Sequence, residues 1–150
     1  MITRTSSAWL RSLRSYVCSL ILFNILWEIL QLPLYTIWAH ENYQKIVYVV
    51  LHCTAGDAMI GALSLVLSLL FVGTETWPYG RFREVVISTI LLGVGYTVFS
   101  EWHNTTVTHN WAYTSAMPTF FGIGLAPIAQ WIVIPGFSFW QTHRRLQTEQ

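Results

Sequence analysis

The sequence has few charged residues: they account for 10% of its 150 positions, whereas an ordinary soluble domain carries about a quarter. Eight Lys and Arg stand against seven Asp and Glu, so the chain also lacks the excess positive charge that a nucleic-acid-binding surface needs. It has only two cysteines and no C-x-x-C pair, which argues against thiol redox chemistry. These absences exclude nucleic acid as a partner and argue against a water-soluble globule.

Hydrophobic residues are abundant instead, at 53%, and they gather in long blocks. Four blocks, residues 16–38, 46–72, 85–102 and 119–140, approach or exceed the roughly 20 residues that a helix needs to cross hydrocarbon. The connections between them are short, so consecutive helices are expected to be antiparallel neighbours. We therefore predict an all-α fold, a single domain over residues 1–150 built as an antiparallel bundle of four transmembrane helices and followed by a short polar tail.

The placement of positive charge predicts how this bundle is oriented in the membrane. One side carries seven arginines: Arg4, Arg11, Arg14, Arg81, Arg83, Arg144 and Arg145. The other side carries only Lys45. Because translocated loops avoid Lys and Arg, both termini are expected in the cytoplasm of a bacterial cell, with the protein in the inner membrane. Aromatic residues expected at the inner interface are Trp9, Tyr16, Trp77, Tyr79 and Trp140. Those expected at the outer interface are Trp38, Tyr43, Tyr48, Trp102, Trp111 and Tyr113.

Polar residues within the first block form one stripe of the predicted helix. Asn24, Glu28, Gln31 and Tyr35 are spaced four, three and four residues apart. A carboxylate facing lipid costs several kcal/mol, so this stripe is expected to face other helices or a wet cavity. Pro33 removes one helical hydrogen bond, and we expect a kink there.

The second block carries a seam of small and polar residues, namely Thr54, Asp57, Gly61, Ser64 and Ser68. Small residues at such spacing are common where membrane helices meet. Counted at about 1.5 Å per residue from the outer ends, Glu28 and Asp57 lie at nearly the same depth, about 15 and 16 Å. Two buried acids at one level are not expected to be ionised together, so one is able to store a proton. His52 flanks this seam.

The third and fourth blocks add weaker polar signals. The third contains a repeat of Thr89, Gly93, Tyr96 and Ser100. Its outer end adds Glu101, His103 and His109, for which an ordinary solvated loop is the simplest interpretation. Gln130 is the only strongly polar residue in the middle of the fourth block. The inner half of the bundle is almost wholly apolar, which favours a polar pocket that opens outward.

The first functional hypothesis is a pocket for a lipid or isoprenoid-like molecule. In it Glu28 and Asp57 are the candidate catalytic residues, binding or shuttling a proton as general acid and base. The residues expected to position the ligand are Gln31, Tyr35, His52, Glu101 and His103. The alternative for the two acids is a hydrogen-bonded network that only fixes helix packing. The sequence does not decide whether the protein is an enzyme, and it assigns no cofactor.

Two further functions stay open at this point. The Gly and Ser seams also suit a non-enzymatic subunit or assembly factor that contacts a membrane-protein partner. A metal or haem binder at the outer face would draw on His40, His52, Glu101, His103 and His109. Because no spacing among these residues specifies a metal, we assign no metal ligand.

Several motifs resemble known families. The first resemblance is carried by the segments 27–36, 96–102, 111–113, 117–118, 122–127 and 130–131. Through them the chain resembles a family of small bacterial four-helix inner-membrane proteins. The resemblance covers most of the chain and implies no particular activity. The stretch Glu28-x-x-Gln31-Leu32-Pro33, followed by His52, is also similar to the sterol-isomerase-like EXPERA membrane domain. The helix order differs, because the 85–102 block intervenes before the helix with Ala126 and Pro127. Isomerase activity is therefore not carried over.

Overall fold

The computed structural model describes residues 2–148, with side chains from Ala8 onward. The long helices are α1 (Ile2–Gln31), α3 (Tyr43–Phe71), α4 (Phe82–Trp102) and α5 (Leu125–Thr148). The short elements are η1 (Leu32–Leu34), α2 (Ile37–His40), the π-helix η2 (His103–Val107), β1 (Thr119–Phe120) and β2 (Ile123–Gly124). The fold is all-helical apart from this two-stranded hairpin, as predicted.

Three helices of the described chain are long and apolar enough to cross a membrane. The candidate spans are Ala8–Leu34, Tyr43–Phe71 and Phe82–Val107, which overlap the first three predicted blocks. The fourth block is not among them, because α5 carries more polar residues. The architecture is therefore that of a multi-pass membrane protein with three clear candidate spans.

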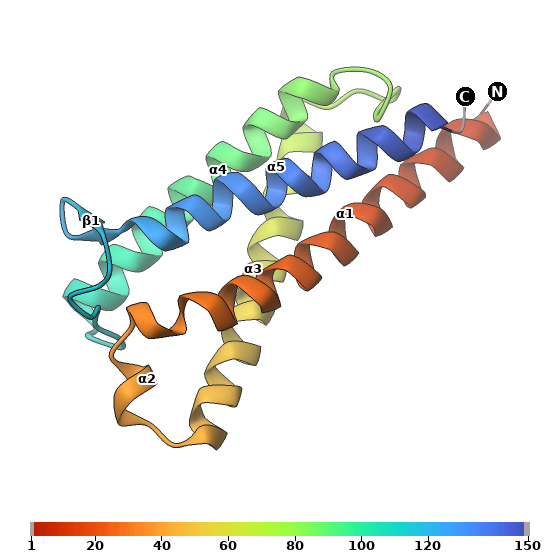
Figure 1. Ribbon diagram of the computed structural model, residues 1–150. Coiled ribbons are helices and arrows are strands. Elements are labelled where there is room, and N and C mark those ends of the chain that lie inside the picture. The colour runs from red at the N-terminus through yellow and green to blue at the C-terminus, as the bar shows by residue number, and fades with distance from the viewer. Residues whose placement is uncertain (1, 149–150) are drawn as a thin grey trace.

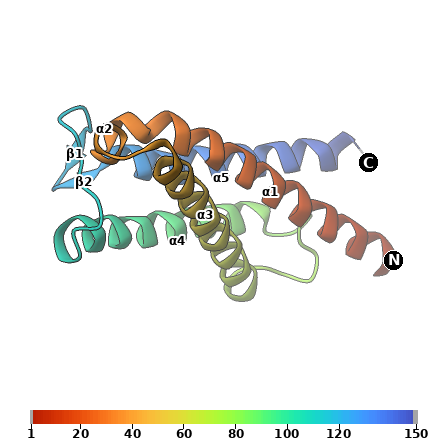
Figure 2. The same ribbon diagram turned by 90° about the horizontal axis from the view of Figure 1, so that it is seen from below.

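The four long helices form a closed ring of contacts. α1 packs against α3 and α5, and α4 packs against the same two helices. In Figures 1 and 2, the axes of α1, α4 and α5 are roughly aligned, with α5 antiparallel to α1, while the axis of α3 is inclined across them. The N- and C-terminal ends lie together at one end of the bundle, whereas α2 and the β-hairpin lie at the other (Figure 1). We call these the terminal end and the hairpin end.

The apolar core lies toward the terminal end. Tyr16 is fully buried there, with its ring centroid 4.4 Å from that of Phe139, and Trp77 is 1% exposed. The expectation that Tyr16 and Trp77 sit at a membrane interface is therefore wrong. The loop between α3 and α4 folds against the bundle, so Trp77 packs edge-on against Trp9 at 6.4 Å.

The first predicted span ends earlier than expected. The α-helix stops at Gln31 and continues as the 3₁₀ turn η1, and Tyr35 then adopts an extended backbone. Pro33 stands in the first positions of η1, where its missing N–H costs little. The expected single kinked helix through residue 38 is thus replaced by α1 and η1, then the extended residue Tyr35, and then α2.

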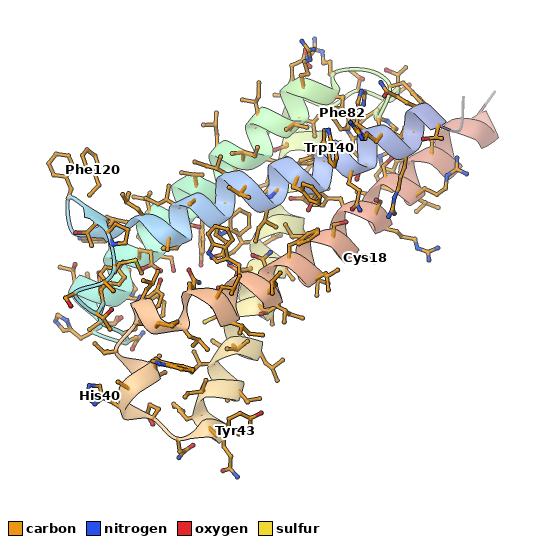
Figure 3. The ribbon with its side chains drawn as sticks, in the orientation of Figure 1. Cys18, His40, Tyr43, Phe82, Phe120 and Trp140 are labelled. Carbon is orange, nitrogen blue, oxygen red and sulfur yellow. The ribbon has the colours of Figure 1, made fainter. Side chains whose placement is uncertain are left out.

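The fourth predicted block is also displaced. Residues 119–124 form the β1–β2 hairpin, and α5 begins only at Leu125. The positive φ angles of Phe121 (49°) and Gly122 (78°) make the turn and are incompatible with a helix. Phe120 projects from this hairpin (Figure 3). At its other end α5 extends through Thr148, so the tail expected after residue 140 is helical, with Thr142 and Leu146 buried.

The small-residue seams are covered by the chain itself. Thr54, Gly61, Ser64 and Ser68 of α3 are buried, as predicted. A Cβ atom at Gly61 would lie 2.2 Å from Leu20 of α1. The buried face of α4 recurs every four residues, at Val85, Thr89, Gly93, Thr97 and Glu101. Tyr96, expected on this face, is 50% exposed.

Candidate functional site

Five polar side chains from three helices form one buried network, which we call the carboxyl cluster: Asn24, Glu28 and Gln31 of α1, Asp57 of α3 and Gln130 of α5. The Gln130 amide is at its centre. Its Nε2 lies 2.7 Å from Asn24 Oδ1, 2.9 Å from Asp57 Oδ2 and 3.1 Å from Glu28 Oε1. One side chain therefore joins α5 to both α1 and α3.

The remaining hydrogen bonds of the cluster come from α1 itself. Gln31 Nε2 donates to Glu28 Oε1 at 2.8 Å and lies 3.3 Å from Gln130 Oε1. Gln31 Oε1 accepts from the Trp27 indole at 3.2 Å, and Asn24 Nδ2 donates to the Leu20 carbonyl at 2.8 Å. The stripe spacing of residues 24, 28 and 31 brings these groups together, as the sequence predicted.

The donors in the carboxyl cluster are too few for two ionised acids. The Gln130 amide has two hydrogens but three acceptors within bonding distance. Glu28 and Asp57 accept from the same amide nitrogen and are close enough for their charges to act on each other. Two ionised carboxylates at this spacing repel each other, so one proton on the pair removes an unfavourable charge contact.

A third acid, Glu101 of α4, is held in what we call the Glu101 cage, made with Tyr35, Trp111 and Tyr113. Tyr113 donates its phenolic hydrogen to Glu101 Oε2. The Tyr35 hydroxyl and the Trp111 indole contact the same oxygen, each at 3.4 Å. Glu101 is 6% exposed, so the expectation of a solvated loop at this position is wrong.

Backbone pairing explains how the cage forms. Tyr35 and Tyr113 make an isolated antiparallel bridge, and their ring centroids are 5.5 Å apart. Thr36 N donates to the Ala112 carbonyl at 2.9 Å, and Thr114 N donates to the Leu34 carbonyl at 2.9 Å. The segment after α4 thus folds over the end of η1 and carries its aromatic side chains onto Glu101.

Tyr113 is fixed in its role as a donor. Burial, and then its hydrogen bond to Glu101, raise the pKa of the Tyr113 phenol above its ordinary value. Its oxygen also accepts from Gly124 N at 3.0 Å. Tyr113 therefore keeps its proton at neutral pH and ties the β-hairpin to Glu101.

The residues predicted to form the site fall into three groups. Glu28, Asp57 and Gln31 belong to the carboxyl cluster, while Tyr35 and Glu101 belong to the cage. The charges of Glu28 and Glu101 are close enough to act on each other, so the two groups are neighbours.

The two predicted histidines lie apart from both groups. His52 is exposed and stacks on Tyr48, with ring centroids 5.7 Å apart. His103 is half-buried and stacks on Phe99 at 5.8 Å. Neither has a hydrogen bond to any of the three acids. Their role in positioning a ligand gains no geometric support.

Metal binding is not favoured by the part of the chain that the structure describes. No group of three His, Cys, Asp or Glu side chains there is arranged to hold a metal ion. His109 bonds through Nδ1 with the Thr105 carbonyl at 3.1 Å, and His40 is exposed at the end of α2. Cys18 and Cys53 are free thiols.

Sequence reasoning missed three members of these networks. Gln130 was noted only as an isolated polar residue, and Trp111 and Tyr113 only as interface aromatics. The signal for Gln130 was present, because a lone amide in an apolar span needs partners at the same depth. No comparable signal existed for Trp111 and Tyr113, since their positions depend on the fold of a loop.

The comparisons with known proteins add no relative: no family model, curated protein or solved structure matches the chain. The carboxyl cluster and the Glu101 cage are therefore the features that bear on function.

Proposed function

We propose that this chain is a multi-pass integral membrane protein whose Glu28–Asp57 pair holds one proton and exchanges it with a lipid-like or isoprenoid-like molecule. The observation that carries the proposal is the position of the Gln130 amide, within 2.9 Å of Asp57 and 3.1 Å of Glu28, with amide groups as the other donors. No described hydrogen bond brings a cation to either acid. A proton shared by the pair is the simplest way to neutralise it.

The burial of the three acids indicates where a ligand would arrive. Glu28 and Glu101 are 8% and 6% exposed, whereas Asp57 is half-buried. Asp57 is thus the acid that a membrane-dissolved molecule is able to reach, while Glu28 is the internal reservoir. The proton that passes to the ligand returns to the pair from the ligand or from water, so the exchange needs no oxidant or reductant.

Glu101 would serve as the next acceptor toward the hairpin end. Its three donors are neutral phenol and indole groups, whose hydrogen bonds offset part of the cost of burying the ionised carboxylate. An ionised Glu101 near Glu28 favours the protonated state of the pair, because like charges repel. Tyr35 and Tyr113 would act as positioning residues for Glu101.

We also propose that α5 is a fourth span and that both termini are cytoplasmic. α5 is antiparallel to α1 and contacts it from Gln31–Gln130 to Ser15–Arg145. These contacts cover about 24 Å of α1 and 22 Å of α5 at 1.5 Å per residue. α5 therefore extends alongside most of the length of α1, which is itself long enough to span the membrane. The arginines at the terminal end then place that end in the cytoplasm.

The test of the shared proton is infrared spectroscopy of the full chain in lipid nanodiscs. A protonated carboxyl has a carbonyl band distinct from that of a carboxylate. At neutral pH we expect one such band, which Glu28→Gln or Asp57→Asn shifts or removes while Glu75→Gln, at an exposed loop position, leaves it unchanged. A spectrum without a protonated carboxyl would overturn the proposal.

The test of exchange with a ligand uses the purified chain and isoprenoid alcohols in detergent. Native mass spectrometry is expected to detect a complex that Asp57→Asn weakens and Glu75→Gln does not. Proton transfer is followed by deuterium uptake at a carbon atom of the bound isoprenoid in D₂O, because its hydroxyl hydrogen exchanges with water without the protein. If the isoprenoid binds Asp57→Asn and Glu75→Gln equally and takes up no deuterium, the proposed proton exchange is wrong.

A purely structural role is the second candidate, and one observation favours it. The amides of Asn24, Gln31 and Gln130 all have hydrogen-bond partners within the cluster, as a packing network requires. In that case Glu28→Gln lowers the thermal stability of the protein without changing any ligand signal. A proton-exchanging pair instead loses ligand exchange while the folded protein persists.

A further inference from the structure

A separate pocket lies at the terminal end, between α1 and α5, far from the carboxyl cluster along both helices. It has a volume of about 290 Å³, near the lower limit for small-ligand sites. Its lining residues, which we call the arginine pocket, are Arg11, Ser12, Arg14, Ser15, Cys18, Thr142, Arg145 and Leu146. Three of these lining residues are arginines, and none is acidic.

One buried hydroxyl of the pocket lacks a partner. Ser12 is 1% exposed, and its Oγ has no hydrogen bond within the described chain. An unpaired buried polar atom costs roughly 1–3 kcal/mol. By contrast, Ser15 Oγ accepts from Arg145 Nη1 at 3.2 Å, which holds that guanidinium at the pocket. The pocket thus offers an unused hydroxyl beside an oriented cation.

The surface above the pocket is apolar. Cys18 of α1 is exposed (Figure 3), and Leu22 and Leu26 follow it at intervals of four residues with 64% and 52% exposure. Residues four apart lie on the same face of a helix, so an apolar stripe leads from the pocket toward the middle of the bundle. A charged pocket continuous with an apolar stripe matches a headgroup with its acyl chain.

We propose that the arginine pocket binds the phosphate of an anionic phospholipid. Arg11, Arg14 and Arg145 supply charge-assisted hydrogen bonds, for which the planar guanidinium is well suited to phosphate. Ser12 donates its hydroxyl to a phosphate oxygen, and the acyl chain lies along Cys18 and Leu22. This proposal is independent of the proton held by Glu28 and Asp57.

The chain offers a matched control for the charge. Arg144 is next to Arg145 in sequence but stacks on Trp140, with its guanidinium carbon 4.3 Å from the ring centroid. It does not line the pocket. Arg144→Gln and Arg145→Gln therefore remove the same charge from the same helical turn, and only the second changes the pocket.

The experiment measures the thermal stability of the full chain in a neutral detergent after addition of phosphatidylglycerol, phosphatidylcholine or inorganic phosphate. Phosphatidylglycerol is expected to raise the unfolding temperature, because a ligand that binds only the folded state stabilises it. Native mass spectrometry is expected to show Arg145→Gln losing about 10- to 100-fold in affinity, the loss of one or two charge-assisted bonds. Arg144→Gln keeps the affinity of the unchanged protein.

Ser12→Ala distinguishes a hydroxyl that binds a ligand from a buried hydroxyl that is merely unpaired. Without lipid it is expected to leave stability unchanged or raised, since it removes an unpaired hydroxyl; with phosphatidylglycerol it should show a smaller gain than the unchanged protein. An equal rise in unfolding temperature with inorganic phosphate would show that the pocket binds a free anion and not a lipid. Absence of protection by either anion, or equal losses for Arg144→Gln and Arg145→Gln, would overturn the site.

Discussion

Gln130 of α5 donates a hydrogen bond from Nε2 to Oδ2 of Asp57 on α3, across 2.9 Å. These residues are 73 positions apart in the chain, and the contact joins helices that stand opposite each other in the ring of four. The same nitrogen reaches Glu28, so one amide organises both acids.

Replacing Gln130 by Leu should destabilise the folded protein by about 1–3 kcal/mol, because Asn24, Glu28 and Asp57 lose their common donor in a buried setting. The free energy of unfolding in mixed detergent micelles measures the effect. Gln147→Leu, at an exposed position of the same helix, is the control and should stay within about 0.5 kcal/mol. Equal effects of both changes would show that the cluster is not stabilising.

Gly93→Ala should cost about 1–3 kcal/mol, because its new Cβ would lie 2.2 Å from Cε3 of the rigid Trp131 ring. Gly95→Ala provides the comparison two residues later on α4, where no atom lies within 4 Å of an added Cβ. Thermal unfolding of the two variants should therefore diverge, with Gly95→Ala near the unchanged protein. A tolerated Gly93→Ala would contradict the close contact of α4 with α5.

The stability of the protein should fall as pH rises above about 10, the ordinary pKa of tyrosine. Burial raises the pKa of Tyr113 in the folded chain, so the unfolded chain ionises first, and ionisation lowers its free energy relative to that of the folded chain. Below pH 10 both states keep the proton and Tyr113 contributes no pH dependence. Tyr113→Phe should make the free energy of unfolding less steep above pH 10, whatever its value at neutral pH. Parallel curves for the two proteins would refute this.

His52→Ala should leave the infrared carboxyl band unchanged, because His52 is exposed, stacks on Tyr48 and contacts neither acid. Asp57→Asn, in contrast, should alter the band. Spectra of both variants in nanodiscs make the comparison. A changed band in His52→Ala would show that His52 interacts with the two acids, contrary to its position in the structure.

The proposed four-span topology is tested by cysteine labelling in cells, in a Cys18→Ala, Cys53→Ala background. Glu41→Cys, in the loop before α3, should react with a membrane-impermeant maleimide added outside. Glu75→Cys, in the loop before α4, should react only after the membrane is opened, since it lies at the terminal end with the arginines. The same accessibility at both positions would contradict the arrangement, and the reverse pattern would invert the orientation.

The placement of the two acids follows from helical spacing, which is local. Residues 24, 28 and 31 share one face of any α-helix, and Glu28 and Asp57 reach the same depth when counted from the polar loops. Asn24 and Gln31 could therefore be predicted to join Glu28, and Asp57 to face it. The register of α4 was less predictable: Tyr96 and Thr97 differ by one position, and the structure buries Thr97, on the face where Gly93 packs against Trp131.

The Glu101 cage was not predictable because its donors come from irregular backbone. Trp111 and Tyr113 reach Glu101 through the bridge between Tyr35 and Tyr113, which has no periodic pattern in the sequence. The β-hairpin likewise depends on two residues with positive φ, one of them Phe121, which seldom adopts that conformation.

The amino-acid sequence by itself determined that this chain has helices long and apolar enough to cross a membrane, and which acids lie inward, because hydrophobic length and helical period act on each segment separately. Tertiary structure alone decided that Gln130 bridges the acids, that Glu101 is enclosed by aromatic donors, and that arginines of α1 and α5 line one pocket. Such contacts join residues far apart in the chain, and hydrogen bonds and close packing are satisfied only once the helices have met.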